Sequence, residues 1–185
     1  MRIFLFIVAL IAGTFSTLTA RQSGPAPDPK LHSQLKQLFP AATFSPKFPE
    51  PPHYKAFAPG GSTNRLRQGS GGQEAAPLGL AFWTTEIEPL ERGYDGPIKI
   101  LVGMDTKGIL TGIIVAAHNE PYGDFSVDRP EFAAQFKGKS IRDPFRVGGD
   151  VDAVSRATIT VTSAARAIRI SARRMATQLL TPPAK

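Results

Sequence analysis

Apolar positions in the second half of the chain form two neighbouring runs of the kind found in β-strands. The segment 98–105 alternates β-branched with other side chains, and 109–119 is a second, continuous apolar run. Two β-branched runs on either side of a short turn are typical of a β-hairpin. We therefore predict an antiparallel hairpin over 98–119 that turns near Thr106–Gly108.

The sequence also predicts a helix near the start of the domain and another near its end. Leucines recur every three or four residues from Leu31 until Pro40 ends the periodicity, and 162–180 is rich in good helix formers. Shorter elements are predicted as strands at 53–58 and 78–87 and as a helix near 130–136. These elements predict an α+β fold: an antiparallel sheet with a central hairpin, a short N-terminal helix and a C-terminal helix packed on it.

The first twenty residues have the pattern of a secretory signal peptide. Arg2 precedes an apolar run, and the small residue Ala20 precedes a polar stretch. Leu18 is not the small residue preferred near such a cleavage site, so the run could instead remain as an anchor, although it is shorter than the about 20 residues that usually span a membrane. We predict export to the periplasm or another extracytoplasmic location, with or without anchoring by the N-terminus. The predicted organisation is a signal peptide at 1–20, a spacer at 21–30 and one domain at 31–181 with a flexible loop at about 59–76.

Composition restricts the chemistry that the chain can carry. Its 22 Lys and Arg against 15 Asp and Glu give a formal charge of +7, which favours anionic partners. The absence of Cys excludes disulfides, thiolate metal sites, iron–sulfur clusters and thioether-linked haem. The three histidines are scattered, and neither a nucleophile elbow nor a complete phosphate-binding loop is present. We therefore expect no metal site, no catalytic residues and no self-sufficient enzyme.

Two stretches remain as candidates for a binding site. "HNEPYG" (His118–Gly123) ends the most apolar predicted strand and carries His118 and Glu120 into a Pro/Gly loop, where they are either ordinary turn residues or part of a site. "DAVSRATIT" (Asp152–Thr160) concentrates hydroxyl side chains just ahead of the last predicted helix. Capping of the helix explains one hydroxyl. The surplus suggests the alternative, an anion such as phosphate held at the helix N-terminus.

These stretches resemble the FMN-binding domain family. "DAVSRATIT" is similar to its flavinylation motif, usually D-x-x-[ST]-G-A-T-x-T, and "LFPAA", "LVGMDTKGILTGIIVAAH", "HNEPYG" and "FAAQFKGKSI" follow in the family's order, so the resemblance spans roughly 31–180. Such domains occur in the periplasmic part of nitrous-oxide-reductase regulators of the NosR/NirI type, which this chain resembles most. They also occur in the flavin-carrying subunits of the Rnf complex and of the sodium-pumping NADH:quinone reductase.

The resemblance implies roles for individual residues. In the family a flavin transferase esterifies the FMN phosphate to the last threonine of the motif, which is Thr160 here. The same match assigns the remaining cofactor-binding residues of the motif, namely Asp152, Ser155, Arg156, Ala157 and Thr158. If flavin binds, His118 and Glu120 are expected to lie close to it.

Arg156 is the departure from the family pattern, which usually has Gly at this position. Gly can be required there for a positive φ or for close approach of the cofactor. Arg156 is therefore expected either to point outward or to pair with the phosphate, and covalent attachment depends on whether it is tolerated.

The resulting hypothesis is an exported FMN carrier that transfers electrons to or from an unidentified redox partner at the membrane. FMN is the expected cofactor, covalently bound at Thr160, and a flavin transferase is the expected maturation partner. Two alternatives stay open. One is a flavin-free accessory module of a membrane redox or denitrification system. The other is adherence of the C-terminal arginines to anionic lipid or nucleic acid, although no nucleic-acid partner is expected.

Overall fold

The computed structural model describes residues 28–44, 53–58 and 77–180. The predicted signal peptide, most of the predicted spacer and the predicted loop at 59–76 lie outside these residues. The proposed domain limits of 31–181 therefore stay a prediction, although the first described helix begins at Pro29.

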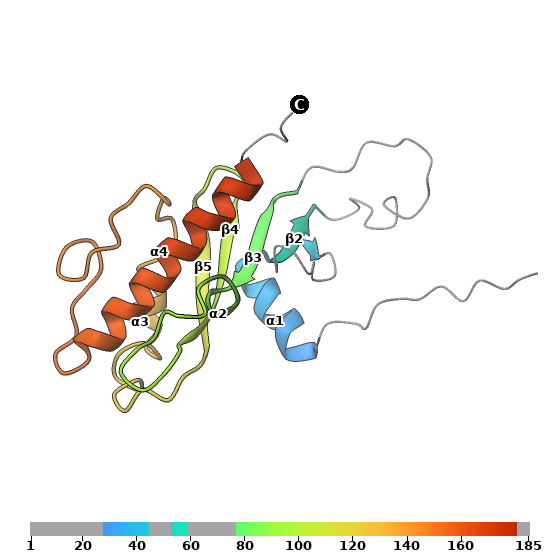
Figure 1. Ribbon diagram of the computed structural model, residues 1–185. Coiled ribbons are helices and arrows are strands. Elements are labelled where there is room, and N and C mark those ends of the chain that lie inside the picture. The colour runs from blue at the N-terminus through green and yellow to red at the C-terminus, as the bar shows by residue number, and fades with distance from the viewer. Residues whose placement is uncertain (1–27, 45–52, 59–76, 181–185) are drawn as a thin grey trace, which may run out of the picture.

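The described strands form one antiparallel sheet in which neighbours in the chain are neighbours in space (Figure 1). Its five strands follow the order β1-β2-β3-β4-β5. They are β1 (Thr43–Phe44), β2 (His53–Phe57), β3 (Gly79–Trp83), β4 (Lys99–Asp105) and β5 (Leu110–Ala117). With a short N-terminal helix and a long C-terminal helix, this architecture confirms the predicted α+β class.

The predicted hairpin is β4 and β5, joined by a turn that the sequence of the turn explains. The Asp105 carboxylate accepts the backbone N–H groups of Lys107 at 2.8 Å and Ile109 at 2.9 Å. Gly108 follows with φ 78°, a conformation in which a side chain is strained. Because β5 is the last strand of the order, the hairpin forms one edge of the sheet rather than its centre.

Four helices accompany the sheet in the described residues: α1 (Pro29–Leu38), α2 (Thr84–Ile87), α3 (Pro130–Ala134) and α4 (Thr158–Leu180). The strand predicted over 78–87 is wrong in its second half, because α2 replaces it after Trp83. The Thr84 hydroxyl donates to the Ile98 carbonyl at 3.2 Å and accepts from the Ile100 N–H at 3.1 Å. This side chain satisfies the backbone of the neighbouring segment, so the chain can leave the sheet there.

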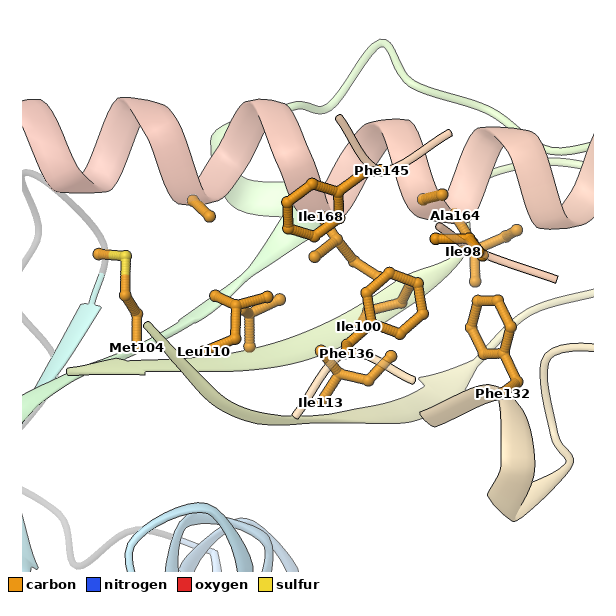
Figure 2. Packing of buried hydrophobic residues seen from close by; sticks show 14 of the residues in the cluster. Ile98, Ile100, Met104, Leu110, Ile113, Phe132, Phe136, Phe145, Ala164 and Ile168 are labelled. Carbon is orange, nitrogen blue, oxygen red and sulfur yellow. The ribbon is translucent and has the colours of Figure 1, made fainter. Parts of the chain in front are cut away.

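The two faces of the sheet carry separate hydrophobic clusters. Ile100, Val102 and Met104 of β4 point to the cluster under α4, whereas Leu101 belongs to the cluster under α1. Figure 2 shows α4 on one side of the strands and α1 on the other, with Ala164 and Ile168 of α4 facing the sheet. Because the side chains of β4 alternate between the two faces of the sheet, both faces are buried. The packing of α4 on one of these faces holds the helix in place.

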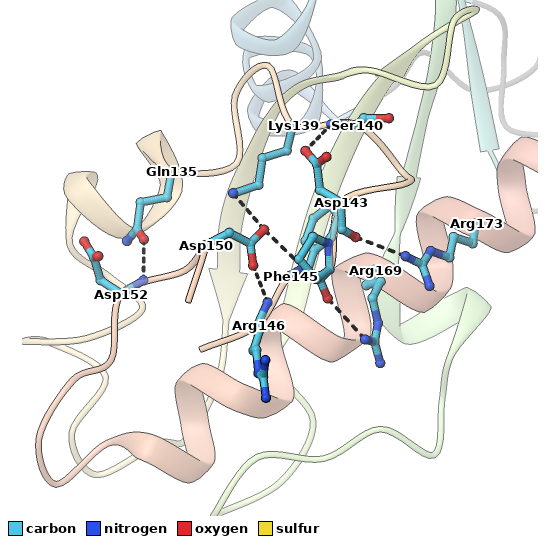
Figure 3. A network of polar contacts seen from close by, with 11 residues as sticks. Gln135, Lys139, Ser140, Asp143, Phe145, Arg146, Asp150, Asp152, Arg169 and Arg173 are labelled. Atoms are coloured by element: carbon cyan, nitrogen blue, oxygen red, sulfur yellow. Dashed lines mark hydrogen bonds and ion pairs between the residues drawn. The ribbon is translucent and has the colours of Figure 1, made fainter. Parts of the chain in front are cut away.

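Arginines of α4 hold the loop that precedes the helix (Figure 3). Arg169 donates to the Pro144 carbonyl at 3.2 Å, and Arg173 donates to the carbonyls of Ile141 and Asp143 at 2.7 and 3.0 Å. Arg166 and Arg174, on the other flank, donate to Glu91 and to the Ile87 carbonyl. These contacts give the helical arginines a role in holding the neighbouring segments of the fold.

Asp150 organises the same loop from within (Figure 3). Its carboxylate accepts from Lys139 Nζ at 3.0 Å and from the backbone N–H groups of Phe145 and Arg146 at 3.1 and 2.5 Å. Burial raises the pKa of this carboxyl, but the N–H donors and the Lys139 charge lower it by more, so the net pKa lies below its usual value. The loop therefore fixes the position at which the 152–160 segment begins.

Candidate functional site

A pocket of about 510 Å³ opens at the N-terminal end of α4. Three segments that are distant in sequence meet there: a turn before β4, the loop after β5 and the start of α4. The residues that line it are Tyr94, Pro121, Tyr122, Arg156, Ala157, Thr158, Ile159 and Thr160. Both stretches that the sequence singled out therefore contribute to one pocket.

The start of α4 presents unpaired backbone donors. The helix begins at Thr158, four residues before the predicted start at Thr162, and the first helical bond runs from the Val161 N–H to the Ala157 carbonyl at 2.9 Å. The N–H groups of Thr158, Ile159 and Thr160 have no acceptor among the described residues. No hydroxyl of 152–160 caps them, so the capping explanation finds no support among these residues.

Arg156 adopts a left-handed backbone conformation with φ 68°. Glycine is the residue that takes this conformation without steric cost. The backbone at this position therefore gives a physical reason for the glycine of the family motif. Arg156 fits into the same turn at the expense of backbone strain.

The two threonines of the motif differ sharply in access to solvent. Thr158 is exposed and lines the pocket, whereas Thr160 is 2% exposed. The Thr160 hydroxyl also donates a hydrogen bond to the Glu120 carboxylate. Thr158 is thus the motif threonine that a second protein could reach without a rearrangement of the fold.

Glu120 joins the three segments that form the pocket. Besides the Thr160 hydroxyl, its carboxylate accepts the backbone N–H groups of Tyr94 at 3.0 Å and Asp95 at 2.9 Å. Burial raises the pKa of Glu120, but the hydrogen bonds from these three donors lower it by more, so the net pKa lies below the usual value. Gly93 makes room for this carboxylate, since a Cβ there would lie 2.3 Å from Glu120 Oε1.

His118 supports Glu120 from behind and does not line the pocket. Its Nδ1 accepts a hydrogen bond from the Glu120 N–H at 3.1 Å, so the ring proton lies on Nε2. The Nε2–H group donates a hydrogen bond to the Asp128 carboxylate at 2.9 Å. Gly123 packs against the ring, where a Cβ would lie 2.0 Å from His118 Cε1. The "HNEPYG" stretch is therefore an ordered loop in which His118 fixes Glu120, and Glu120 reaches the motif.

The pocket lies in the part of the chain that matches a known family. Residues 93–172 match the family model of the FMN-binding domain. This segment of the chain is similar to the FMN-binding domain. The matched segment covers less than half of the chain, but it contains β4, β5 and every residue that lines the pocket. The N-terminal likeness predicted around "LFPAA" lies outside it.

Similar proteins include several that are described as a subunit of the ion-translocating oxidoreductase complex. The protein from Pseudomonas aeruginosa is 38% identical over 88 residues, covering 41% of this chain and 40% of the relative. The protein from Aliivibrio fischeri is 31% identical over 117 residues, covering 54% and 55% respectively. The chain thus spans about two fifths to half of the length of the relatives it matches. The predicted closer likeness to the NosR/NirI type stays a prediction.

The residues predicted for the FMN site fall into three groups. Arg156, Ala157, Thr158 and Thr160 line the pocket, and Glu120 lies directly behind Thr160. Ser155 and Asp152 are exposed and do not line it. The Asp152 backbone N–H donates to the Gln135 side chain at 2.7 Å, which fixes the start of the motif (Figure 3).

Sequence reasoning missed the aromatic part of the pocket. Tyr94 and Tyr122 are 69% and 44% exposed, which is unusual for large side chains with apolar rings, and Ile159 is 58% exposed. Tyr122 also pairs with Phe125 at a ring distance of 5.3 Å. Tyr122 lies inside "HNEPYG" and Ile159 inside the motif, so only Tyr94 had no local signal.

The carboxylates around the pocket predict a loss of stability in acid. Glu91 resembles Glu120: burial raises its pKa, but hydrogen bonds from Arg166 and Ser163 and the Arg166 charge lower it by more. Since both folded pKa values lie below the ordinary 4.5, the unfolded state binds more protons near that pH. The stabilisation is therefore fully present above about pH 4.5 and is lost as the pH falls through the folded values.

The measurement is the urea midpoint of unfolding at several pH values. We expect a steady fall between about pH 5 and pH 3 and a shallower fall in Glu120→Gln, which has no proton to gain at this position. A wild-type midpoint that does not change across this range would contradict the assigned contacts.

Two other classes of feature find no support in the described part of the chain. No group of three or more potential metal ligands comes together there. Among the helices that the structure describes, none has the length and apolarity needed to cross a membrane.

Proposed function

We propose that the chain is an exported FMN carrier that moves electrons, with the flavin attached through a phosphoester to a threonine of the motif. The observation that carries the proposal is the pocket inside the FMN-binding domain, where unpaired helix N–H groups and an exposed threonine hydroxyl adjoin. The similarity to a subunit of an ion-translocating oxidoreductase complex supports electron transfer as the activity.

The chemistry of the pocket fits FMN. Its volume of about 510 Å³ lies within the range of small-molecule sites, which is about 300–1,000 Å³. The unpaired N–H groups of Thr158, Ile159 and Thr160 suit a phosphate, and the positive end of the α4 dipole favours its charge. Tyr94 and Tyr122 offer aromatic surface for an isoalloxazine ring.

FMN, when bound, would supply the capacity to accept and release electrons; the protein supplies attachment, orientation and electrostatics. Thr158 and the first turn of α4 would hold the phosphate end. Tyr94 and Tyr122 would limit the access of water to the ring. Glu120, through its bonds to Thr160 and to the Tyr94 N–H, would keep the two sides of the pocket in register.

The burial of Thr160 moves the proposed attachment point from Thr160 to Thr158. A transferase must bring its own active site and the FMN phosphate to the hydroxyl, and of these two threonines only Thr158 is exposed. The Thr160 hydroxyl already donates a hydrogen bond to the Glu120 carboxylate and would have to leave this buried bond to react. Thr160 therefore has a positioning role in this proposal.

Maturation and location complete the proposal. A flavin transferase would attach the cofactor, and the redox partner would lie at the membrane, outside the cytoplasm. The basis for export is the pattern of Arg2, the apolar run and Ala20.

We expect full-length protein expressed in a Gram-negative host to appear in the periplasmic or membrane fraction. N-terminal sequencing should find a mature chain that starts near Arg21 if the signal is cleaved, or Met1 in the membrane fraction if it is retained. Protein that starts at Met1 and accumulates in the cytosol would contradict export. A variant with Arg2→Glu should reduce export, because the positive start of the signal is lost.

The alternative, a flavin-free accessory module, draws support from one observation, the arginine at the glycine position of the motif. A redox titration separates the two functions. Protein co-expressed with a flavin transferase should take up electrons in proportion to its flavin content. A colourless protein that takes up none after such co-expression would favour the accessory module.

A further inference from the structure

One flank of α4 carries positive charge that no carboxylate neutralises. Arg169 and Arg173 donate hydrogen bonds only to backbone carbonyls of the loop at 137–150. In the described part of the chain neither guanidinium forms an ion pair, although each is held in position by these bonds. A carbonyl accepts a hydrogen bond without cancelling the charge of the donor, so this flank stays cationic.

The other flank of the same helix is neutralised by carboxylates. Arg166 Nη2 lies 2.7 Å from Glu91 Oε1, and Arg174 Nε lies 2.7 Å from Glu88 Oε1. The helix therefore pairs its arginines with acids on one side and leaves them unpaired on the side that adjoins the loop.

The loop beside the cationic flank adds two more unpaired guanidinium groups. Arg142 and Arg146 are exposed, and among the described residues their side chains have no hydrogen-bond or ion-pair partner. The two carboxylates of the loop are engaged within it, Asp150 by Lys139 Nζ at 3.0 Å and Asp143 by a backbone N–H at 2.8 Å. Four arginines thus form a basic patch, three of which are labelled around the loop in Figure 3: Arg142, Arg146, Arg169 and Arg173.

The basic patch is separate from the pocket. None of its four arginines is among the residues that line the pocket. Arg169 follows Thr158, the first residue of α4, by about three helical turns, which corresponds to roughly 16 Å along the helix axis. A partner that contacts the basic patch therefore leaves the pocket open.

We propose that the basic patch docks the domain on the surface of a membrane that contains anionic phospholipids. Unpaired charges spread over a helix flank and a loop match the distributed negative charge of such a surface, and each basic residue near it adds to the attraction. The formal charge of +7 adds attraction at longer range. The choice of lipid over nucleic acid rests on export, which is part of the proposed function. Docking would hold the pocket close to a redox partner in the membrane.

The experiment measures co-sedimentation of the full-length protein with lipid vesicles at low ionic strength. One set of vesicles contains phosphatidylcholine alone, and the other contains phosphatidylcholine and phosphatidylglycerol in equal parts. The wild type should bind the anionic vesicles at least about tenfold more tightly, and high salt should remove this difference. Binding through the apolar run near the N-terminus would occur with both kinds of vesicle, so the comparison isolates the electrostatic contribution.

The patch variant is Arg142→Gln combined with Arg146→Gln, which removes two side chains that bond to no other described residue and should leave the fold intact. Its affinity for anionic vesicles should fall about twentyfold, from about fivefold for each arginine. Lysine at both positions should keep most of the affinity, because the attraction depends on charge.

The matched control is Lys30→Gln combined with Lys99→Gln. Lys30 lies in α1, and Lys99 lies over the Trp83 ring in the cluster under α1, so the control removes two exposed charges from the other face of the sheet. Its affinity for anionic vesicles should change by about twofold or less, because these charges lie away from the docked surface.

Two results would overturn the proposal directly: equal binding to both kinds of vesicle, and a patch variant that binds as the wild type does. Equal losses in the patch variant and the control would also overturn it, because net charge alone would then account for binding. Patch-dependent binding to duplex DNA or to an acidic protein, without binding to anionic vesicles, would assign the patch to another partner. The assay involves neither flavin nor export, so each of these results leaves the proposed function intact. A protein that takes up no flavin but binds anionic vesicles through the patch would contradict the proposed function alone.

Discussion

Thr158→Ala is expected to abolish covalent flavin attachment while the protein stays folded. Thr158 is exposed at the pocket, so its hydroxyl is accessible and its loss leaves no buried group unpaired. Removal of an exposed side chain in the first turn of a helix costs within about 0.5 kcal/mol. The measurement is in-gel flavin fluorescence of the denatured protein after co-expression with a flavin transferase.

The matched control is Thr160→Val, which keeps the shape of the side chain and removes its hydroxyl. This variant should retain covalent flavin but lose about 1–3 kcal/mol of stability, because Glu120 loses one of its donors in a buried site. The reverse pattern, with fluorescence in Thr158→Ala and none in Thr160→Val, would restore Thr160 as the attachment point.

Glu120→Ala is expected to destabilise the fold by about 2–4 kcal/mol. Its carboxylate is the acceptor for the Thr160 hydroxyl and for the N–H groups of Tyr94 and Asp95. Truncation would leave these donors without a partner in a site where Glu120 itself is 6% exposed. Urea unfolding at neutral pH measures the loss.

Glu131→Ala is the control for this prediction. Glu131 forms an ion pair with Arg129 at 3.2 Å in which both side chains are more than half exposed. Exposed pairs of this kind contribute at most about 1 kcal/mol. Equal effects of the two substitutions would mean that Glu120 does not hold the three segments together.

Local chemistry explains which parts of the fold could be predicted. The β4–β5 hairpin was predictable because Asp105 and Gly108 specify the turn within four residues. The end of β3 was not, because Thr84 leaves the strand by bonding to Ile98 and Ile100, more than a dozen residues away. The start of α4 was missed because the β-branched residues at 158–160 have low helix propensity, which tertiary packing overrides.

The candidate site, like the fold, could be predicted only where local sequence patterns specify it. Surplus hydroxyls and the "HNEPYG" loop were visible as local patterns, and both contribute to the pocket. The bond between Thr160 and Glu120 links residues 40 positions apart and depends on the packing of α4 against the sheet. The exposure of Thr158 and the burial of Thr160 follow from the same packing, so the sequence motif alone did not distinguish the two hydroxyls.

The intact mass of the purified wild-type protein, with and without co-expression of a flavin transferase, tests the central claim most directly. The account predicts that the transferase adds the mass of one esterified FMN per chain and that protein made without it has the unmodified mass. Protein that keeps the unmodified mass in the presence of a transferase active on a control substrate, and that also fails to bind free FMN, would contradict the account.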